Sequence, residues 1–140
     1  MRLAADLCRS WMAEATVARL ATVRPDGRPH LVPITFALLE PDLIVTAVDH
    51  KPKSTARLTR LDNIRANPNV SVLADRYSDD WRGLWWVRAD GHAAVVDSGE
   101  QWEGAIGALG DKYRQYRGDP PSGPAIVVMV QTWTGWSAMR

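Results

Sequence analysis

Residues 18–33 read ARLATVRPDGRPHLVP, and this stretch predicts the antiparallel hairpin around which we expect the chain to fold. Two apolar runs, Val17–Val23 and His30–Leu39, flank a connection in which Asp26-Gly27 supplies the positive φ of a tight hairpin turn. Pro33 has no backbone N–H to donate to a ladder, so its strand is expected at a sheet edge or at a bulge. Such an edge is open to a partner other than a neighbouring strand.

Apolar residues on either side of the hairpin recur with the periods of strands and of helices. Leu3, Leu7 and Trp11 are spaced as the apolar stripe of a short helix over Leu3–Ala15. Ser98 and Gln101 have the spacing of a capping box, which would begin a helix whose apolar face runs to Tyr116. The other elements expected are strands at 43–48, 69–75, 84–96 (bent near 90–91) and 125–131, and a helix after residue 55 that ends before Asn67-Pro68.

This order of elements predicts a mainly β fold, an antiparallel barrel with flanking helices, instead of a parallel doubly wound sheet. The sequence contains no Gly-x-Gly-x-x-Gly, so it lacks the usual mark of a Rossmann unit. The 140 residues, 46% apolar and 24% charged, suit one domain over 1–140.

The sequence also indicates a compartment and disfavours two kinds of stabilising site. No apolar run is long enough to span a bilayer, and charge interrupts the N-terminus before a signal-peptide core, which favours the cytoplasm. Cys8 is the single cysteine, and no Cys/His spacing suits zinc, so neither a disulfide nor a metal site is expected.

A basic segment lies between the expected strand 43–48 and the helix that follows it. Residues 50–65 have a net charge of +4, in a chain whose total is +1. Such a compact island suits one small anion better than a nucleic-acid backbone, which needs a broad basic face. The donors for a phosphate are Lys51, Lys53, Ser54, Thr55 and Arg57. The alternative is that these charges form the solvated side of an amphipathic helix.

Aromatic residues gather in and before the strand 84–96. Because side chains alternate along a strand, Trp85 and Trp86 are expected on opposite faces, and only one indole can enter the protein's own core. The other indole needs a ligand or a second subunit, which favours a homodimer with this strand in its seam, unless a helix simply shields it. In the preceding loop, residues 77–82, Trp81 would close over a planar ring or, alternatively, only pack against the protein.

The ordered combination of these motifs resembles the pyridoxamine 5′-phosphate oxidase-like split β-barrel superfamily. The resemblance is carried by residues 18–33, the Lys-rich segment, Asn67–Leu73 and Trp86–Ala93. Further motifs are similar to the actinobacterial branch that uses the deazaflavin coenzyme F420. These are Asp80-Trp81, Lys112–Arg117, Pro120–Pro124 and Trp133–Trp136.

The resemblance implies a homodimer with two cofactor sites at the subunit seam. The backbone of the strand Val32, Pro33, Ile34 and Thr35 would lie along the edge of the cofactor ring. The basic segment would hold the phosphate, through Lys51, Lys53, Ser54, Thr55 and Arg57, and Trp85, Trp86 and Arg88 of a second copy would approach the ring. FMN-using pyridoxamine phosphate oxidases carry extra C-terminal residues that grip pyridoxal phosphate. This chain ends soon after Trp136, which weakens vitamin B6 oxidation as the reaction.

The expected function is therefore that of a cytoplasmic F420-dependent reductase that transfers a hydride from reduced deazaflavin to a planar or conjugated small molecule. The cofactor would supply the chemistry, and the sequence offers no candidate for a catalytic proton donor. The alternatives are an FMN-dependent enzyme on the same barrel and a non-catalytic protein that binds a flavin or a haem-derived ligand. The charge pattern disfavours a barrel that binds single-stranded nucleic acid.

Overall fold

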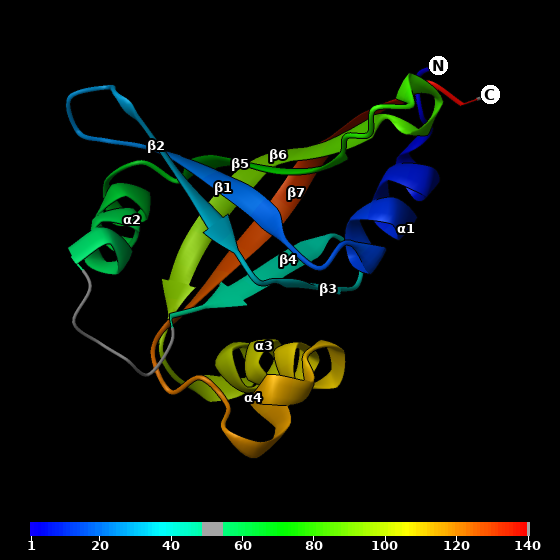
Figure 1. The fold of residues 1–140 in the computed structure, drawn as a ribbon. Coiled ribbons are helices and arrows are strands. Elements are labelled where there is room, and N and C mark those ends of the chain that lie inside the picture. The colour runs from blue at the N-terminus through cyan, green and yellow to red at the C-terminus, as the bar shows by residue number, and fades with distance from the viewer. Residues whose placement is uncertain (49–54, 140) are drawn as a thin grey trace.

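The predicted hairpin forms at one edge of an antiparallel sheet (Figure 1). The structure, a computed structural model, describes residues 1–48 and 55–139, and for residues 55–58 it describes the backbone alone. Within these residues the sheet has seven strands in the order β2-β1-β5-β6-β7-β4-β3. The elements are α1 (Ala5–Glu14), β1 (Ala18–Val23), β2 (Pro29–Ile34), β3 (Ala37–Leu39), β4 (Leu43–Ala47), α2 (Thr55–Ala66), β5 (Asn69–Arg76), the 3-10 turn η1 (Trp81–Gly83), β6 (Trp85–Val96), α3 (Gly99–Lys112), α4 (Arg114–Gly118) and β7 (Ala125–Ser137).

The turn and the edge position agree with the sequence. Gly27 has φ +87° in the connection between β1 and β2, and its N–H donates to the carbonyl of Arg24. β2 pairs with β1 on one side and is an edge strand within the described sheet, as Pro33 predicted.

The expected strand over His30–Leu39 is wrong, because the chain leaves the sheet at Thr35 and re-enters it as β3, paired with β4. The hydroxyl of Thr46 donates to the carbonyl of Thr35 over 2.6 Å, and the N–H of Phe36 donates to the hydroxyl of Tyr113 over 3.0 Å. These tertiary bonds take up backbone groups that a continuous strand would use in its ladder. Since β2 and β3 are both sheet edges, the curled sheet stays split, which confirms the mainly β split barrel with flanking helices.

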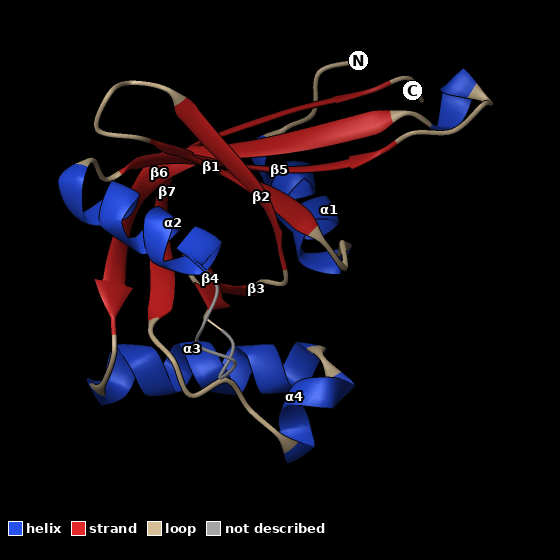
Figure 2. Cartoon of the chain, turned by 60° about the vertical axis from the view of Figure 1, so that its left-hand side comes forward, coloured by secondary structure: helices blue, strands red, loops and turns tan. Residues whose placement is uncertain are grey.

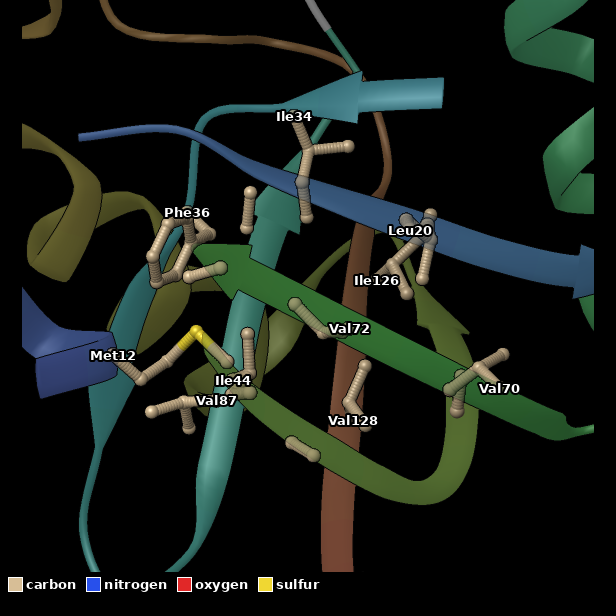
Figure 3. Close-up of a cluster of buried hydrophobic side chains, with 14 of the residues drawn as sticks. Met12, Leu20, Ile34, Phe36, Ile44, Val70, Val72, Val87, Ile126 and Val128 are labelled. Carbon is tan, nitrogen blue, oxygen red and sulfur yellow. The ribbon is translucent and has the colours of Figure 1, made fainter. Parts of the chain in front are cut away.

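The core fills the inside of the curled sheet (Figure 3). Phe36, Met12 and Leu20 are its largest fully buried side chains. The pairing of β6 with β7 shifts register between Asp90 and Gly91, which confirms the predicted bend. A Cβ on Gly91 would overlap the carbonyl oxygen of Met129, so glycine is needed where β6 and β7 approach each other.

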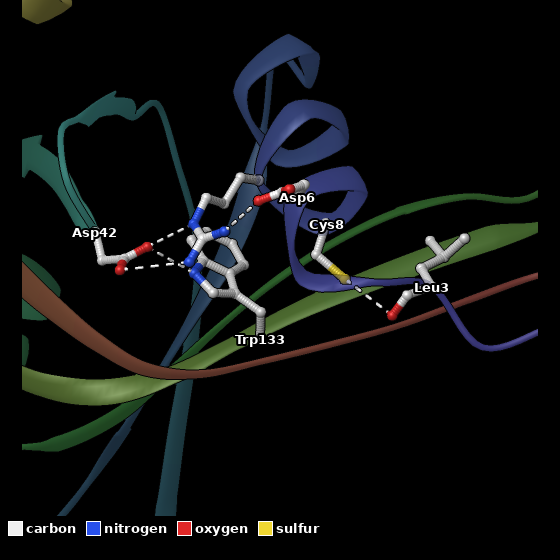
Figure 4. Close-up of polar contacts among 6 residues, drawn as sticks. Leu3, Asp6, Cys8, Asp42 and Trp133 are labelled. Atoms are coloured by element: carbon white, nitrogen blue, oxygen red, sulfur yellow. Dashed lines mark hydrogen bonds and ion pairs between the residues drawn. The ribbon is translucent and has the colours of Figure 1, made fainter.

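The expected apolar stripe of the first helix is confirmed at Trp11, which packs against the core, but it is wrong at Leu7. Cys8 and Met12 are the buried residues of α1, whereas Leu7 is 43% exposed, and Leu3 is buried before the helix begins. The helix is fixed to the sheet by Arg9, whose guanidinium donates to Asp42 over 2.6 Å (Figure 4). The indole N–H of Trp133 on β7 donates to the same carboxylate over 3.0 Å. This polar contact selects the face of α1 as much as the apolar stripe does.

The last helical region also departs from the expectation. Ser98 precedes α3, but its side chain caps no backbone N–H, so the predicted capping box does not form. The expected helix through Tyr116 is two helices, because Tyr113 has extended backbone angles (φ −113°, ψ 117°) and separates α3 from α4. β7 runs on to Ser137, beyond the expected end at residue 131. Among the described helices none is long and apolar enough to cross a membrane.

Candidate functional site

The edge strand β2 presents its two faces to different surroundings. Ile34 is buried in the barrel and Val32 is half-buried, while Pro33 is exposed on the opposite face. On the side away from β1, alternate backbone N–H and C=O groups of β2 face no neighbouring strand of the described sheet. At the end of the strand, the hydroxyl of Thr35 lies 2.9 Å from that of Tyr116. The strand edge can therefore offer donors and acceptors to a flat heterocycle.

The predicted anion-binding residues lie mostly outside the described part. Lys51, Lys53 and Ser54 are not described, and of Thr55 and Arg57 the structure gives only their place in the first turn of α2. α2 is held against the barrel by Asn63, whose buried amide donates to the hydroxyl of Thr22 over 3.0 Å.

The described residues near α2 have a positive electrostatic field. Burial lowers the pKa of His30, and the nearby positive charges of Arg24 and Arg60 lower it further. This histidine thus reports positive potential where α2 meets the β1–β2 hairpin. The free edge of β2 and this field fit a planar heterocycle with an anionic tail.

The two adjacent tryptophans point to opposite faces of β6, as the alternation predicted. Trp85 lies on the inner side, with its ring 5.3 Å from that of Trp11 on α1. Trp85 is thus the indole that enters the protein's own core, where it packs beside α1. Trp86 lies on the outer face, 5.7 Å below the guanidinium of Arg88.

A shallow pocket of about 440 Å³ lies on this outer face of β2, β1, β5 and β6. Its lining residues are Arg19, Ala21, Leu31, Ser71, Leu73, Asp75, Trp86 and Arg88. The two guanidinium groups are paired with carboxylates, Arg19 with Asp75 at 3.5 Å and Arg88 with Asp90 at 3.0 Å. Leu31 is 65% exposed in the single chain, and Figure 2 shows the labelled helices on the other side of these strands. The described part of one chain therefore leaves this partly apolar surface uncovered.

Trp81 does not join this pocket within one chain. It is 70% exposed in η1, on the connection between β5 and β6, as is Tyr77 beside it. The carboxylate of Asp80 accepts from the N–H and the side chain of Arg82, which shapes the turn. The three predicted ligands thus lie in different surroundings: Trp81 is exposed on the β5–β6 connection, Trp85 packs inside against α1, and Trp86 lies on the outer face of β6.

Sequence reasoning missed a second pocket, of about 550 Å³, beside Thr35. It is lined by Thr16, Thr35, Lys112, Tyr113, Arg114, Gln115 and Tyr116. The sequence predicts a helix whose apolar face runs to Tyr116, but in the structure the hydroxyl groups of Tyr113 and Tyr116 contact the turn after β2. The signal that could have found them is Lys112, a charged residue placed next to that apolar face.

No cluster of three or more His, Cys, Asp or Glu side chains that could hold a metal occurs among residues 1–48 and 55–139. Burial lowers the pKa of Lys112 to about 8 and raises that of Tyr113.

The chain was compared with protein families and with solved structures, and both comparisons found similar proteins. The family model described as Pyridoxamine 5′-phosphate oxidase matches residues 4–137. No curated protein sequence matches the chain. A conserved hypothetical protein, Rv2991 of Mycobacterium tuberculosis, has a TM-score of 0.78 at 19% identity, over 97% of this chain and 86% of the other. At that identity the likeness is one of fold.

Two further solved structures are described as FAD-binding proteins. That of Mesorhizobium loti (mll6688) has a TM-score of 0.71 at 22% identity, over 96% of this chain and 95% of the other. That of Mycobacterium smegmatis has a TM-score of 0.66 at 17% identity, over 97% of this chain and 98% of the other.

Proposed function

Because the chain belongs to the pyridoxamine 5′-phosphate oxidase family, we propose that it is an oxidoreductase that binds a flavin-type tricyclic cofactor between two copies of itself. The favoured cofactor is the deazaflavin F420, and the acceptor is a planar or conjugated small molecule. The observation that carries the proposal is the free edge of β2, which runs from Pro29 to Ile34 beside the uncovered outer face.

Different residues of the chain would bind the ring and the anionic tail of the cofactor. Backbone groups of Val32, Pro33 and Ile34, with Thr35 after them, would hydrogen-bond the edge of the ring. The anionic tail would lie at the start of α2, and Arg24 and Arg60, whose charges act on His30, add positive charge where α2 meets the β1–β2 hairpin. The contacts from Lys51, Lys53, Ser54, Thr55 and Arg57 remain predictions from the sequence.

A second copy would complete the site. The outer face around Leu31 and Trp86 is apolar and uncovered in a single chain, and a small protein seldom leaves such a surface to water. Pairing through this face would bring Trp86 and Arg88 of one copy toward the site on the other. The exposed Trp81 would then lie near the seam instead of in solvent.

When bound, the reduced cofactor would supply the hydride, and the protein would need only to orient the two reactants and exclude water. The half-buried aromatic residues at the seam would serve that exclusion. The main alternative is an FMN- or FAD-dependent enzyme, which the two FAD-binding proteins of similar fold favour.

Parallel titrations with F420, FMN and FAD test the cofactor, with the quenching of tryptophan fluorescence as the measurement. We expect F420 to bind at low micromolar concentration or tighter, and FMN and FAD to bind more weakly. Tighter binding of either flavin would overturn the choice of F420, and no binding of any of the three would overturn the proposed function.

The double variant Lys53→Ala with Arg57→Ala tests the anion site. The loss of two charge-assisted hydrogen bonds should weaken cofactor binding by about a hundred- to ten-thousand-fold, with little change in melting temperature. The matched control is Arg28→Ala with Arg65→Ala, which removes two exposed arginines, each paired with a nearby aspartate. If both double variants bind alike, the basic segment is not the cofactor site.

Turnover separates an enzyme from a storage protein on the same barrel. The reduced cofactor, bound to the protein, is mixed with a panel of quinones, nitroaromatics and enones, and its reoxidation is followed by absorbance. Reoxidation faster than in free solution supports catalysis, whereas tight binding with no acceleration for any acceptor supports a non-catalytic role.

A further inference from the structure

We infer that the pocket between Thr35 and the α3–α4 corner binds the carboxylate of an unsaturated acid with a flat, conjugated body, and that this acid is the acceptor in the proposed reaction. One carbon of its carbon–carbon double bond would take the hydride from the reduced cofactor and the other carbon a proton from solvent, which leaves a saturated bond and the oxidised cofactor. The role of the acid as an acceptor rests on the proposed function, but its binding does not. The pocket, of about 550 Å³, is named here the corner pocket.

The corner pocket has a fixed frame. The hydroxyl of Tyr113 accepts from the N–H of Phe36 and donates to the carbonyl of Thr16 over 2.8 Å. The hydroxyl of Tyr116 lies 2.9 Å from that of Thr35, and the two tyrosine rings meet edge to face with their centres 5.7 Å apart. These contacts join α3 and α4 to the turn that ends β2. A molecule in the corner pocket would therefore touch the end of the strand that is proposed to hold the cofactor ring.

The charge of the corner pocket is positive. Lys112 and Arg114 are among its lining residues, and no aspartate or glutamate is. Neither cation has an ion pair with a described residue. The Nζ atom of Lys112 is buried without a hydrogen-bond acceptor in the described part of the chain, and it lies 3.7 Å from the centre of the Phe36 ring. A buried ammonium without an acceptor is costly, so an anion bound beside it would be stabilised.

The groups around Lys112 favour an anion with a flat apolar body. The Nζ atom of Lys112 lies 3.7 Å from the centre of the Phe36 ring, on the turn after β2, and 5.4 Å from that of the Tyr113 ring. Tyr116 and Arg114 line the same pocket. Asp111 lines the groove on the other side of Lys112, where Ala13 of α1 also lies. The aromatic walls suit a planar ring, and the two cations suit its carboxylate.

The experiment compares benzoate with benzamide, which has the same shape and no charge. The protein is labelled with ¹³C in its tyrosine rings, and spectra are recorded during each titration. The chain has three tyrosines, and Tyr77, 70% exposed on the β5–β6 connection, is the internal control. We expect benzoate to shift Tyr113 and Tyr116 but not Tyr77, and to bind at least about ten-fold more tightly than benzamide.

A second measurement on the same protein follows the ε-carbon of lysine with pH. Lys112 has a pKa of about 8, and saturating benzoate should raise it by more than about one unit, because the anion stabilises the charged form. The other lysines, Lys51 and Lys53, lie in the basic segment, and the variant Lys112→Met identifies the signal. Both measurements use protein without a cofactor, so their outcome does not depend on which cofactor binds.

Variants then test the two cations. Lys112→Met and Arg114→Gln should each weaken benzoate about ten- to a hundred-fold, and the control Arg82→Gln, on an exposed turn, should leave it unchanged. Equal binding of benzoate and benzamide, or shifts that spread to Tyr77, would overturn the corner pocket as a carboxylate site. If benzoate binds as expected and all cofactor titrations fail, the pocket stands and the proposed reaction falls.

Discussion

At the scale of single residues, the positive charge of Lys112 destabilises the folded protein, and this effect depends on pH. Burial lowers its pKa from 10.5 to about 8, so the charged form is less favourable in the folded protein than in the unfolded chain. Between these two pH values the unfolded chain binds more protons, and stability therefore rises as pH increases from about 8 toward 10. Lys112→Met should stabilise the protein by about 1–2 kcal/mol at pH 7, after allowance for partial exposure of the lysine.

Melting curves of Lys112→Met and the wild type at pH 7 and pH 9.5 measure this difference. The gap should narrow at the higher pH, where the wild-type lysine is mostly neutral. Tyr113 works in the opposite sense, because its raised pKa makes the folded state lose stability once the unfolded tyrosine ionises near pH 10, so the comparison stops below that pH. A gap that stays constant with pH would mean that the ammonium is not the destabilising group.

Residues of this kind also mark how far the sequence can predict a site. Asp26-Gly27 and Pro33 were predicted correctly because their effect is local: the turn needs a positive φ, and proline lacks a donor. Lys112 acts through Phe36 and Thr35, which lie more than seventy residues away in the chain. The charge of Lys112 next to an apolar helix face marks an unusual position in the sequence, but nothing in the local pattern shows which distant residues surround it. The corner pocket itself could therefore not be predicted from the sequence.

At the scale of elements, α1 depends on one carboxylate for its position. The guanidinium of Arg9 and the indole of Trp133 both donate to Asp42, and these bonds hold the pKa of Asp42 below its usual range. Asp42→Asn should lower the melting temperature by several degrees near neutral pH and increase hydrogen exchange in α1. The effect should begin to fade as pH falls below 3.8, the ordinary pKa of an aspartate, and should disappear only below the lowered pKa of Asp42 in the folded protein, where its carboxylate takes up a proton.

The matched control is Asp6→Asn, because Asp6 also pairs with Arg9, at 2.8 Å, but its side chain is 98% exposed. A solvated pair of this kind contributes little, so this variant should melt like the wild type. Equal melting of Asp42→Asn and the wild type at pH 7 would show that the buried face of α1, Cys8 and Met12, is sufficient to hold the helix.

The elements themselves show which predictions depend on tertiary contacts. Strand and helix types followed from periodicity, whereas the face of α1 and the division of the chain into β2 and β3 did not. In the first case α1 buries Cys8 and Met12, its Arg9 contacts Asp42, and Leu7 is left exposed. In the second, Thr46 and Tyr113 take the backbone groups of Thr35 and Phe36 out of the ladder. Both decisions are made by residues distant in the sequence.

At the scale of the whole molecule, the mainly β fold was predictable because apolar periodicity marks the strands and Asp26-Gly27 marks a hairpin, and the split barrel followed from the resemblance of the ordered motifs. The cofactor site was predictable only in part. Within one chain, Trp81, Trp85 and Trp86 do not share a site. The described residues of one chain also leave the outer face around Trp86 uncovered. The predicted residues would converge only if a second chain supplies some of them.

The variant Leu31→Glu tests that pairing directly. Leu31 is 65% exposed and lines the outer pocket with Trp86, so a carboxylate there would be buried in the proposed seam without a partner. We expect the wild type to sediment as a dimer and Leu31→Glu as a monomer with nearly the same melting curve at low concentration. The control Leu7→Glu, 43% exposed on α1, should remain a dimer. If the seam also completes the cofactor site, the monomer should lose cofactor affinity together with its partner, whereas a monomer that binds as tightly as the wild type would place the whole site within one chain.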